Sequence, residues 1–545
     1  MSEQQVLERQ PDDLGAALSF HLPPCRVKIL MVTDGGGSFG RADFGLSALL
    51  DALAQPPGPW VRFDVTTKHR GAGGSPPAFR FDSVDLSQYD QIWMIAVLRS
   101  GEELSESELR AIAQFMDGGG GVFATGDHED LGVKMCGRVP RVRSMRKWHW
   151  PSPGPNGEPV APKVDGPDRR DTLSPGRDAG IQFDDQSDDV PQRICPKLYR
   201  SWPWNRYWHR SHPHPLLCGP RGVITVLPDH PHEGECYVPA DLSATFTFDG
   251  YQTTEYPGGI APEVIATSAQ CGHVDDVHKG VVDSAFFGAI GAYDGFRAGV
   301  GRVVVDATWH HFFDINLIGV LGSADPVKGK GFLASDAGKA AFEDIKSYFR
   351  NIAVWLARPA SQRCMWWRAV WWVRWHHQIA MDLRPHYLGG PEHLDIGELL
   401  RVGGEARDAL GRVASQCTVR GWGLDHLVRP ALPRISPDLW PVLDPWFPRQ
   451  PRPVPPLPPP PPQFLSGMHG ELLLDTTLGA AVLALATAFP HLDEETSKRA
   501  AEADLAELAG PHLRQAGRLF QRFAATQQEE LAGFGGALDE RRREE

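Results

Sequence analysis

The sequence lacks the features of several protein classes. It has only 8 cysteines among 545 residues, with no C-x-x-C pair and no short regular spacing. This scarcity argues against a disulfide framework or a cysteine zinc site, and it predicts reduced thiols in a cytoplasmic protein. Basic residues are outnumbered, because 55 Lys and Arg face 68 Asp and Glu, so the net charge is −13 and we expect no nucleic-acid partner. The polar, acidic N-terminus predicts no secretory signal.

Two common cofactor motifs are also missing. The glycine-rich turn from Asp34 to Gly40 matches neither G-x-x-x-x-G-K-[ST] nor G-x-G-x-x-G, because position 38 is serine and no lysine follows. We therefore predict no nucleotide cofactor and interpret the turn as a tight strand-to-helix connection that leaves room for substrate near Asp34 and Gly36. No H-E-x-x-H motif is present.

The first part of the chain alternates short apolar runs with helical patterns. Apolar, β-branched segments typical of strands occupy residues 27–33, 61–65, 91–96, 121–126, 222–227, 261–267 and 301–308. The run at 91–96 is continuously apolar, as expected of a strand buried on both faces, and Ser105 followed by Glu108 indicates a helix start. This alternation predicts an α/β fold with a mostly parallel sheet covered on both faces.

Composition divides the chain into several parts. We expect a leader (1–25), an α/β domain (26–330) with an irregular insertion (137–216), a helical region (331–450), a proline-rich linker (451–463) and C-terminal helices (464–545). The insertion is rich in Pro, Gly and Trp and has no clear periodicity, which is typical of a functional lid or of a partly disordered segment. Nine of the twelve residues from 451 to 462 are proline, so the linker is stiff, and it or the C-terminal helices could contact a protein partner.

Two apolar segments raise the question of membrane contact. Residues 472–489 carry a single charge and reach the lower limit of spanning length, and residues 365–381 combine five Trp with Arg. Either segment would also suit a buried helix of a bundle. We expect membrane contact to be the less favoured reading.

Histidines and carboxylates gather directly after three predicted strands. The clusters are Asp127-His128-Glu129, the loop with His230, His232 and Glu233, and the segment with His310, His311 and Asp314. Because parallel strands place ligand sites beyond their carboxyl ends, these loops are expected to open on one crevice. Imidazole and carboxylate suit a divalent first-row metal, zinc above all, which would generate hydroxide from bound water.

Each residue of these clusters receives a predicted role. The predicted metal ligands are His128, His230, His232, His310 and His311. The predicted catalytic residues are Glu129, Asp127 and Glu233, of which Glu129 is the favoured general base. Asp34, Gly36 and Asp314 are predicted to contact substrate. Because His310 and His311 are adjacent, at most one of them should reach the crevice. The structural alternative is that Asp127 caps a helix and that the histidines satisfy buried backbone groups.

Three segments together carry a family resemblance. Lys28–Gly36, Phe115–Val122 and Gly301–Val305 resemble the trehalose-utilisation (ThuA-like) branch of the class I glutamine amidotransferase-like superfamily, over about residues 26–320. The resemblance implies a flavodoxin-like three-layer sandwich, with the site at the strand carboxyl ends and chemistry on sugars. The superfamily's cysteine nucleophile is missing, because its turn here reads Gly126-Asp127-His128-Glu129.

Two functions remain open at this point. The first is a metal-assisted hydrolase of a sugar-like or other polar small molecule that works without a cysteine nucleophile. The second is a non-catalytic ligand-binding or scaffold protein built on a degenerate amidotransferase-like domain. The proline-rich linker and the helical C-terminal region favour the second, because hydrolysis needs neither.

Overall fold

The computed structural model describes most of the chain. The described residues are 22–71, 78–98, 101–127, 131–148, 192–200, 211–228, 235–271, 284–376, 379, 383, 390–428, 444–446, 463–491 and 494–544. The proline-rich linker and much of the predicted insertion lie outside these ranges.

Five parallel strands form one half of a nine-stranded sheet. They are β1 (Cys25–Thr33), β2 (Val61–His69), β3 (Gln91–Ile95), β4 (Gly121–Thr125) and β15 (Val303–Asp306). Their spatial order is β2-β1-β3-β4-β15, which is the 2-1-3-4-5 order of flavodoxin-like sheets. Every residue of β3 and β4 is buried, as their continuous apolar runs predict.

Antiparallel strands extend the sheet beyond β15. They follow in the order β14 (Ser284–Tyr293), β13 (Glu263–Cys271), β5 (Gln192–Pro196) and β10 (Val226–Leu227). The predicted α/β fold is confirmed, but neither β14 nor β5 was among the predicted strands, and β5 lies inside the predicted irregular insertion (137–216). Three small hairpins flank the sheet: β6 (Leu198–Arg200) with β7 (Ser211–Pro213), β8 (Cys218–Gly219) with β9 (Gly222–Val223), and β11 (Thr245–Phe248) with β12 (Tyr251–Thr254).

Helices cover both faces of the sheet. Helix α4 (Glu106–Asp117) packs on one face and begins with the predicted capping box, in which Ser105 and Glu108 each bond the other's backbone. Helices α3 (Ser47–Ala54) and α8 (Asp336–Leu356) cover the other face. Helix α8 therefore belongs to the sheet body although it lies beyond residue 330. Three short helices complete the body: α5 (Val133–Cys136), α6 (Val142–Met145) and α7 (Asp314–Ile318).

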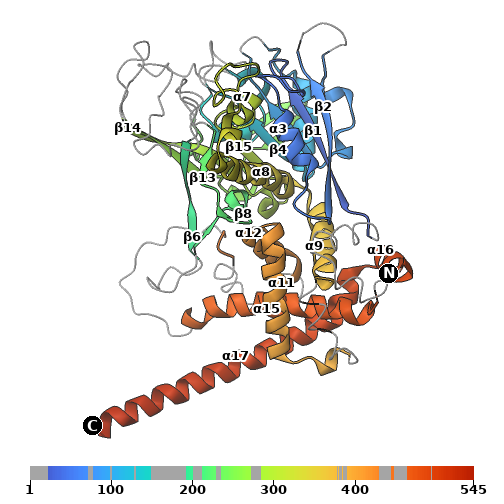
Figure 1. Cartoon of the computed structure of the whole chain (residues 1–545), viewed down its shortest axis with the longest axis vertical. Helices are drawn as coiled ribbons and strands as arrows, with labels where there is room; N and C mark the ends of the chain where they lie inside the picture. The colour runs from blue at the N-terminus through green and yellow to red at the C-terminus, as the bar shows by residue number, and fades with distance from the viewer. Residues whose placement is uncertain are drawn as a thin grey trace.

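The C-terminal helices form a second body below the sheet (Figure 1). They are α9 (Pro359–Arg374), α11 (Ile396–Val413), α12 (Gln416–Gly423), α15 (Gln463–Ala488), α16 (Glu494–Glu502) and α17 (Leu505–Glu544). Helix α9 reaches down from the sheet to α11 and α15, and α17 runs outward to the C-terminus. One continuous hydrophobic core joins the sheet face, α8, α9 and these helices.

Both apolar segments that raised the membrane question are packed inside this assembly. Among the described residues one stretch, Glu471–Ala488 of α15, is long and apolar enough to cross a membrane, and 78% of it is buried. The indoles of Trp366 and Trp371 on α9 are fully buried as well. That membrane contact is possible but less favoured stays a prediction.

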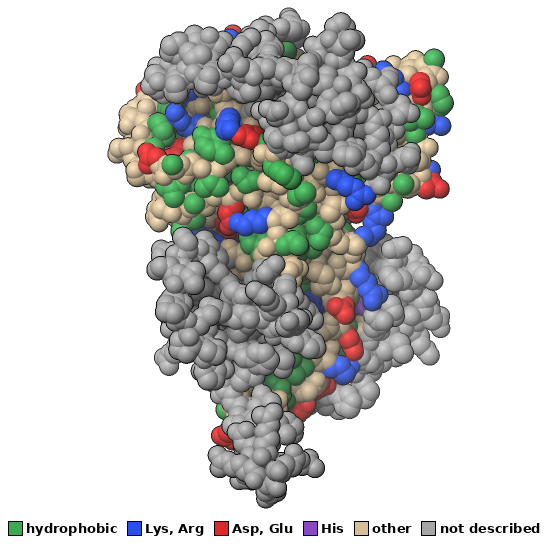
Figure 2. All heavy atoms as spheres, turned by 90° about the vertical axis from the view of Figure 1, so that its left-hand side faces the viewer, with side chains coloured by type: hydrophobic (Ala, Val, Ile, Leu, Met, Phe, Trp, Pro, Cys, Tyr) green, Lys and Arg blue, Asp and Glu red, His purple; other side chains and the backbone are tan. Residues whose placement is uncertain are grey.

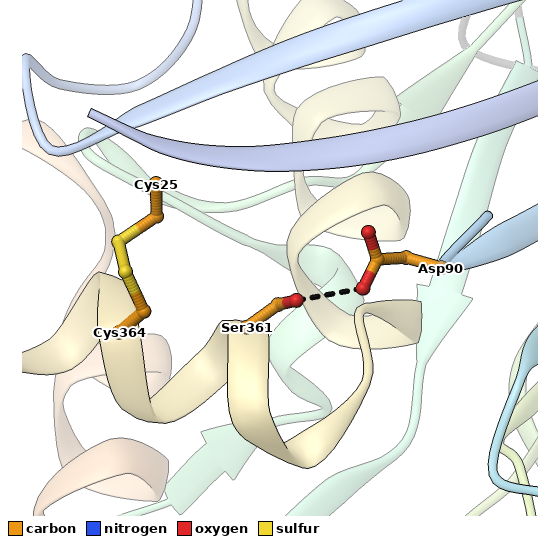
Figure 3. Close-up of a disulfide and its surroundings, with 4 residues drawn as sticks. All are labelled: Cys25, Asp90, Ser361 and Cys364. Carbon is orange, nitrogen blue, oxygen red and sulfur yellow. Dashed lines mark hydrogen bonds between the residues drawn. A yellow bond between two sulfur atoms is a disulfide. The ribbon is translucent and has the colours of Figure 1, made fainter. Parts of the chain in front are cut away.

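A disulfide corrects the prediction that all cysteines are reduced. Cys25 at the start of β1 is bonded to Cys364 on α9, across 339 positions of sequence (Figure 3). The cysteines Cys136, Cys195, Cys218, Cys236 and Cys417 are free thiols. The prediction failed for the bonded pair because sequence spacing carries no information on contacts this remote. The cytoplasmic location stays a prediction.

Candidate functional site

Two predicted site residues meet at the edge where the parallel strands end, which we call the carboxyl edge. Asp127 follows β4 and His310 follows β15, and these strands are neighbours. The Asp127 Oδ2 atom lies 3.0 Å from His310 Nε2, and both side chains are almost completely buried. The structure thus joins a carboxylate and an imidazole that are far apart in sequence.

Arg146 holds the two loops that carry this pair. Its guanidinium donates to the backbone carbonyls of Asp127 and Ala307, the latter at 2.9 Å from Nη2, and it lies 4.4 Å over the ring of Trp148. Burial lowers the pKa of Arg146, and nearby Cys236 and Asp127 counteract this shift. A buried cation next to a buried carboxylate keeps local charge in balance.

The imidazole of His310 has a defined orientation. It stacks on the indole of Trp309 with ring centroids 3.8 Å apart and an interplanar angle of 16°. The backbone N–H of His310 donates to Thr308 Oγ1 at 3.1 Å. Stacking on one side and Asp127 on the other hold the ring in one position, which proton transfer requires.

His311 contacts a different carboxylate. Its Nδ1 lies 2.8 Å from Asp306 Oδ1, and the Tyr348 hydroxyl of α8 donates to Asp306 Oδ2 at 2.8 Å. All three side chains are fully buried. Burial, together with the charge of Asp306, raises the pKa of Tyr348 well above its usual value. The adjacent histidines therefore serve two clusters, and His311 is engaged inside the body.

Asp34 binds backbone rather than side chains. Its Oδ2 accepts the N–H groups of Val97 and Leu98 at 2.7 and 2.6 Å, and its Oδ1 accepts Gly36 N–H at 3.1 Å. Burial raises the pKa of Asp34, and the backbone hydrogen bonds oppose this shift. Gly36 is required by packing, because a Cβ there would lie 2.1 Å from Val97 Cγ2. Contact of Asp34 and Gly36 with substrate stays a prediction.

Asp314 caps a helix. Its Oδ1 accepts the backbone N–H of Ala48 at 2.9 Å and its Oδ2 accepts the Ser47 hydroxyl at 2.6 Å, which satisfies the first turn of α3. Arg41 lies 3.8 Å from the same carboxylate. These contacts give Asp314 a structural role, and its predicted contact with substrate is not tested by them.

The remaining predicted residues, His128, Glu129, His230, His232 and Glu233, lie outside the described residues. Within the described part of the chain no group of three or more metal-ligating side chains comes together. Of the predicted site residues that the structure describes, it therefore brings two, Asp127 and His310, into direct contact.

Four contributors to this edge were not predicted: Arg146, Asp306, Trp309 and Tyr348. Asp306 carried a signal in the sequence, because it is a charged residue at the end of the apolar run of β15. Arg146 and Tyr348 carried none, because each reaches the edge from another part of the chain. A cavity of about 550 Å³ lies at the opposite edge of the sheet, and none of the described site residues lines it.

Comparison with known proteins gives little further guidance. No protein-family model and no curated protein matches the chain. One solved structure, a ThuA-like protein from Parabacteroides merdae, is similar at 14% identity and a TM-score of 0.25, over 52% of this chain and 79% of that one. The likeness is loose, and it agrees with the resemblance of the sequence motifs without adding an argument.

Proposed function

We propose that the chain is a hydrolase that acts on a polar small molecule at the carboxyl edge of the sheet. The observation that carries the proposal is the 3.0 Å contact between Asp127 Oδ2 and His310 Nε2. A buried carboxylate beside an imidazole orients the ring and stabilises the imidazolium form, which makes the histidine an effective general base. A sugar-like substrate is the expectation that the family resemblance supplies.

The proton transfer uses the imidazole of His310. In the proposed reaction the ring takes a proton from water as the water oxygen bonds to the electrophilic atom of the substrate. The ring then returns the proton to the leaving group. Asp127 and Arg146 hold their positions throughout.

A divalent metal ion is the second form of this proposal, in which His310 would bind the ion and the hydroxide supplied by the ion would replace the imidazole as the source of the attacking oxygen. Ligand atoms bound at roughly 2.0–2.2 Å to one zinc ion lie about 3–3.5 Å apart, and the Asp127 and His310 atoms have this spacing. These two residues would hold the ion together with histidines of the loops at 128–130 and 229–234. A bound ion would supply hydroxide at neutral pH.

The first experiment measures metal content and hydrolysis on one preparation. Elemental analysis after metal-supplemented expression is followed by a screen of chromogenic glycosides and esters. We expect Asp127→Asn and His310→Gln to lower kcat/KM by roughly 10²–10⁴-fold and to lower metal content. His393→Gln is the matched control, because His393 is exposed on the C-terminal body.

The outcomes separate the parts of the proposal. If the protein is active but contains less than a tenth of an equivalent of any transition metal, the metal is excluded and the acid–base pair still stands. Activity that survives both substitutions would remove the pair as well.

One observation favours the alternative, a non-catalytic ligand-binding or scaffold protein. The described polar side chains of the carboxyl edge are nearly all buried and engaged by groups of the protein itself. Under this alternative no substrate is turned over by the parent protein, and Asp127→Asn and His310→Gln weaken ligand or partner binding without affecting any turnover.

A further inference from the structure

A second candidate site lies between the sheet body and the C-terminal helices. The edge where the parallel strands begin, here called the amino edge, faces α9 and α12 across a cavity of about 550 Å³. Its lining includes His214, Arg302, Trp355, Arg363, Trp367 and Trp422. Its volume and its place at a junction of two bodies are typical of small-molecule pockets. On the face shown in Figure 2, hydrophobic side chains gather where the two bodies meet.

Most charges that line this cavity are already neutralised. Asp294 lies 2.8 Å from Arg302 Nε and 2.9 Å from Arg297 Nε. Burial raises the pKa of Asp294, but the two guanidinium groups outweigh it and lower the pKa to about 2. Glu263 bonds to Lys197 at 2.7 Å. The carboxylates of Asp425 and Asp444 also line the cavity and have partners of their own.

Arg363 also lines the cavity, and it takes no part in these ion pairs. Its side chain is exposed, and it forms no ion pair or hydrogen bond with the described residues. Its helix is nevertheless fixed to the body on both sides of it (Figure 3). The next residue, Cys364, is disulfide-bonded to Cys25, and the Ser361 hydroxyl donates to Asp90 Oδ1 at 2.6 Å. The guanidinium therefore stands on a rigid element at the cavity.

His214 adds a hydrogen-bond donor inside the cavity. Its Nδ1 accepts the Leu216 N–H at 3.3 Å, so the neutral ring carries its proton on Nε2. Burial, followed by the charge of Arg302, lowers the pKa of His214 to about 3, which keeps the ring neutral. The side chain is only 7% exposed, and its Nε2 bonds to none of the described residues. The Nε2–H group is therefore open to the cavity that His214 lines and can donate to an acceptor on a ligand.

We propose that this cavity binds a planar aromatic molecule that carries one anionic group. The indoles of Trp367 and Trp422 supply apolar and stacking surface for the rings, and Trp355, whose ring Arg302 covers at 4.6 Å, adds apolar wall. Arg363 receives the anion, and His214 Nε2 donates to a ring or carbonyl acceptor. The site is independent of the proposed hydrolase centre, because the two lie at opposite edges of the sheet and share no described residue.

Two related dyes test the ring and the charge separately. Anilinonaphthalene sulfonate carries fused aromatic rings and one anion, and phenylnaphthylamine has the same ring system without the charge. We expect the sulfonate to bind the full-length protein with one-to-one stoichiometry, measured by its fluorescence and by quenching of tryptophan. Arg363→Ala should weaken sulfonate binding about tenfold and leave phenylnaphthylamine binding unchanged.

Control variants guard against non-specific dye binding. Arg522→Ala on α17 removes an exposed arginine far from the cavity and should change neither affinity. Gly421 lines the cavity on α12, where an added Cβ would meet Trp446 Cζ3 at an ordinary 3.8 Å. Gly421→Ala should therefore preserve binding, whereas Gly421→Phe should fill the space and abolish binding of both dyes.

Three results would overturn the proposal. The first is sulfonate binding that is equally strong in Arg363→Ala, because the site then does not recognise an anionic group through Arg363. The second is undiminished binding of both dyes to a folded Gly421→Phe variant, which places the dyes elsewhere. The third is the absence of one-to-one binding in the parent protein. Because Arg363 makes no described contact, its alanine variant should fold and keep the test decisive even if Gly421→Phe does not.

Discussion

The two edges of the sheet differ in whether their polar side chains are bonded by the protein itself or are open to a cavity. At the carboxyl edge the carboxylates of Asp34, Asp306 and Asp314 are buried and held by backbone or side-chain groups of the body itself. At the amino edge a cavity leaves the guanidinium of Arg363 and the Nε2 of His214 available. Clusters of histidine and acid in a sequence therefore do not reveal where a folded protein keeps open space.

The difference has a structural origin. At the carboxyl edge the described polar groups of the sheet body bond one another, as Arg146 bonds the carbonyls that follow β4 and β15. The amino edge is covered by helices that belong to another part of the chain. Packing between two separately formed surfaces leaves gaps that packing within one body does not.

Removal of the disulfide, which lies near the amino edge, is expected to have the largest effect of the changes considered. Cys25→Ser with Cys364→Ser should lower the free energy of unfolding by about 2–5 kcal/mol, because the bond closes a very long loop in the unfolded chain. It should also weaken dye binding at the amino edge and leave the carboxyl edge unchanged. Denaturant unfolding with and without reductant measures the first effect. Recovery of unlinked Cys25 and Cys364 peptides from the non-reduced parent protein would contradict the pairing.

Tyr348→Phe tests whether the Asp306 cluster is structural. Removal of the hydroxyl leaves Asp306 with one partner fewer in a fully buried place, which should cost about 1–3 kcal/mol of stability. Any hydrolysis at Asp127 and His310 should stay within about twofold. Tyr89→Phe is the matched control, since the Tyr89 hydroxyl bonds to none of the described residues, and it should change stability by less than about 0.5 kcal/mol. A large loss of activity in folded Tyr348→Phe would instead indicate that the His310 and His311 clusters act together in one site.

Asp314→Ala separates capping from substrate contact. Loss of the cap of α3 should lower stability by about 0.5–2 kcal/mol without a change in KM. Asp51→Ala, on the exposed side of the same helix, controls for the loss of a carboxylate and should be close to neutral. A raised KM with unchanged stability would instead restore the prediction that Asp314 contacts substrate.

The sequence contained enough information to predict the parallel half of the fold. A short, continuously apolar run such as 91–96 is typical of a strand buried on both faces, and Ser105 with Glu108 marks a helix start through local hydrogen bonds alone. The meeting of Asp127 and His310 follows in part from the sequence, because each residue directly follows an apolar run that predicts a strand; that the two strands are neighbours depends on a remote contact. Their chemical roles remain predictions.

Features that depend on remote contacts could not be predicted in this way. The run that forms β14 (Ser284–Tyr293) is apolar and glycine-rich, and nothing in it shows that it pairs antiparallel to β15. Arg146 looks like any surface arginine, although its buried guanidinium donates to the carbonyl of Ala307, 161 positions away. The bond from Cys25 to Cys364 and the cavity beside it arise only when the two bodies come together.

The smallest expected effect on the folded molecule concerns the thiols at the two edges. Near the carboxyl edge, burial raises the pKa of Cys136 and of Cys236 well above the usual value. Beside the amino edge, a side-chain hydrogen bond with Cys417 lowers the pKa of Cys218 to about 7, and burial only partly opposes it. A lowered pKa means that the thiolate of Cys218 is absent well below pH 7 and forms as the pH rises through about 7.

Ultraviolet absorbance of the thiolate measures this titration without a reagent that must reach the buried sulfur. The difference between the parent protein and Cys218→Ser should titrate with a midpoint near 7. Cys417→Ala should move that midpoint upward, because the thiolate loses its hydrogen-bond donor. Cys136→Ser, at the other edge, should leave it unchanged. If Cys218 titrates no lower than an ordinary thiol, the two edges do not differ in this respect, and the contrast between them rests on the cavity alone.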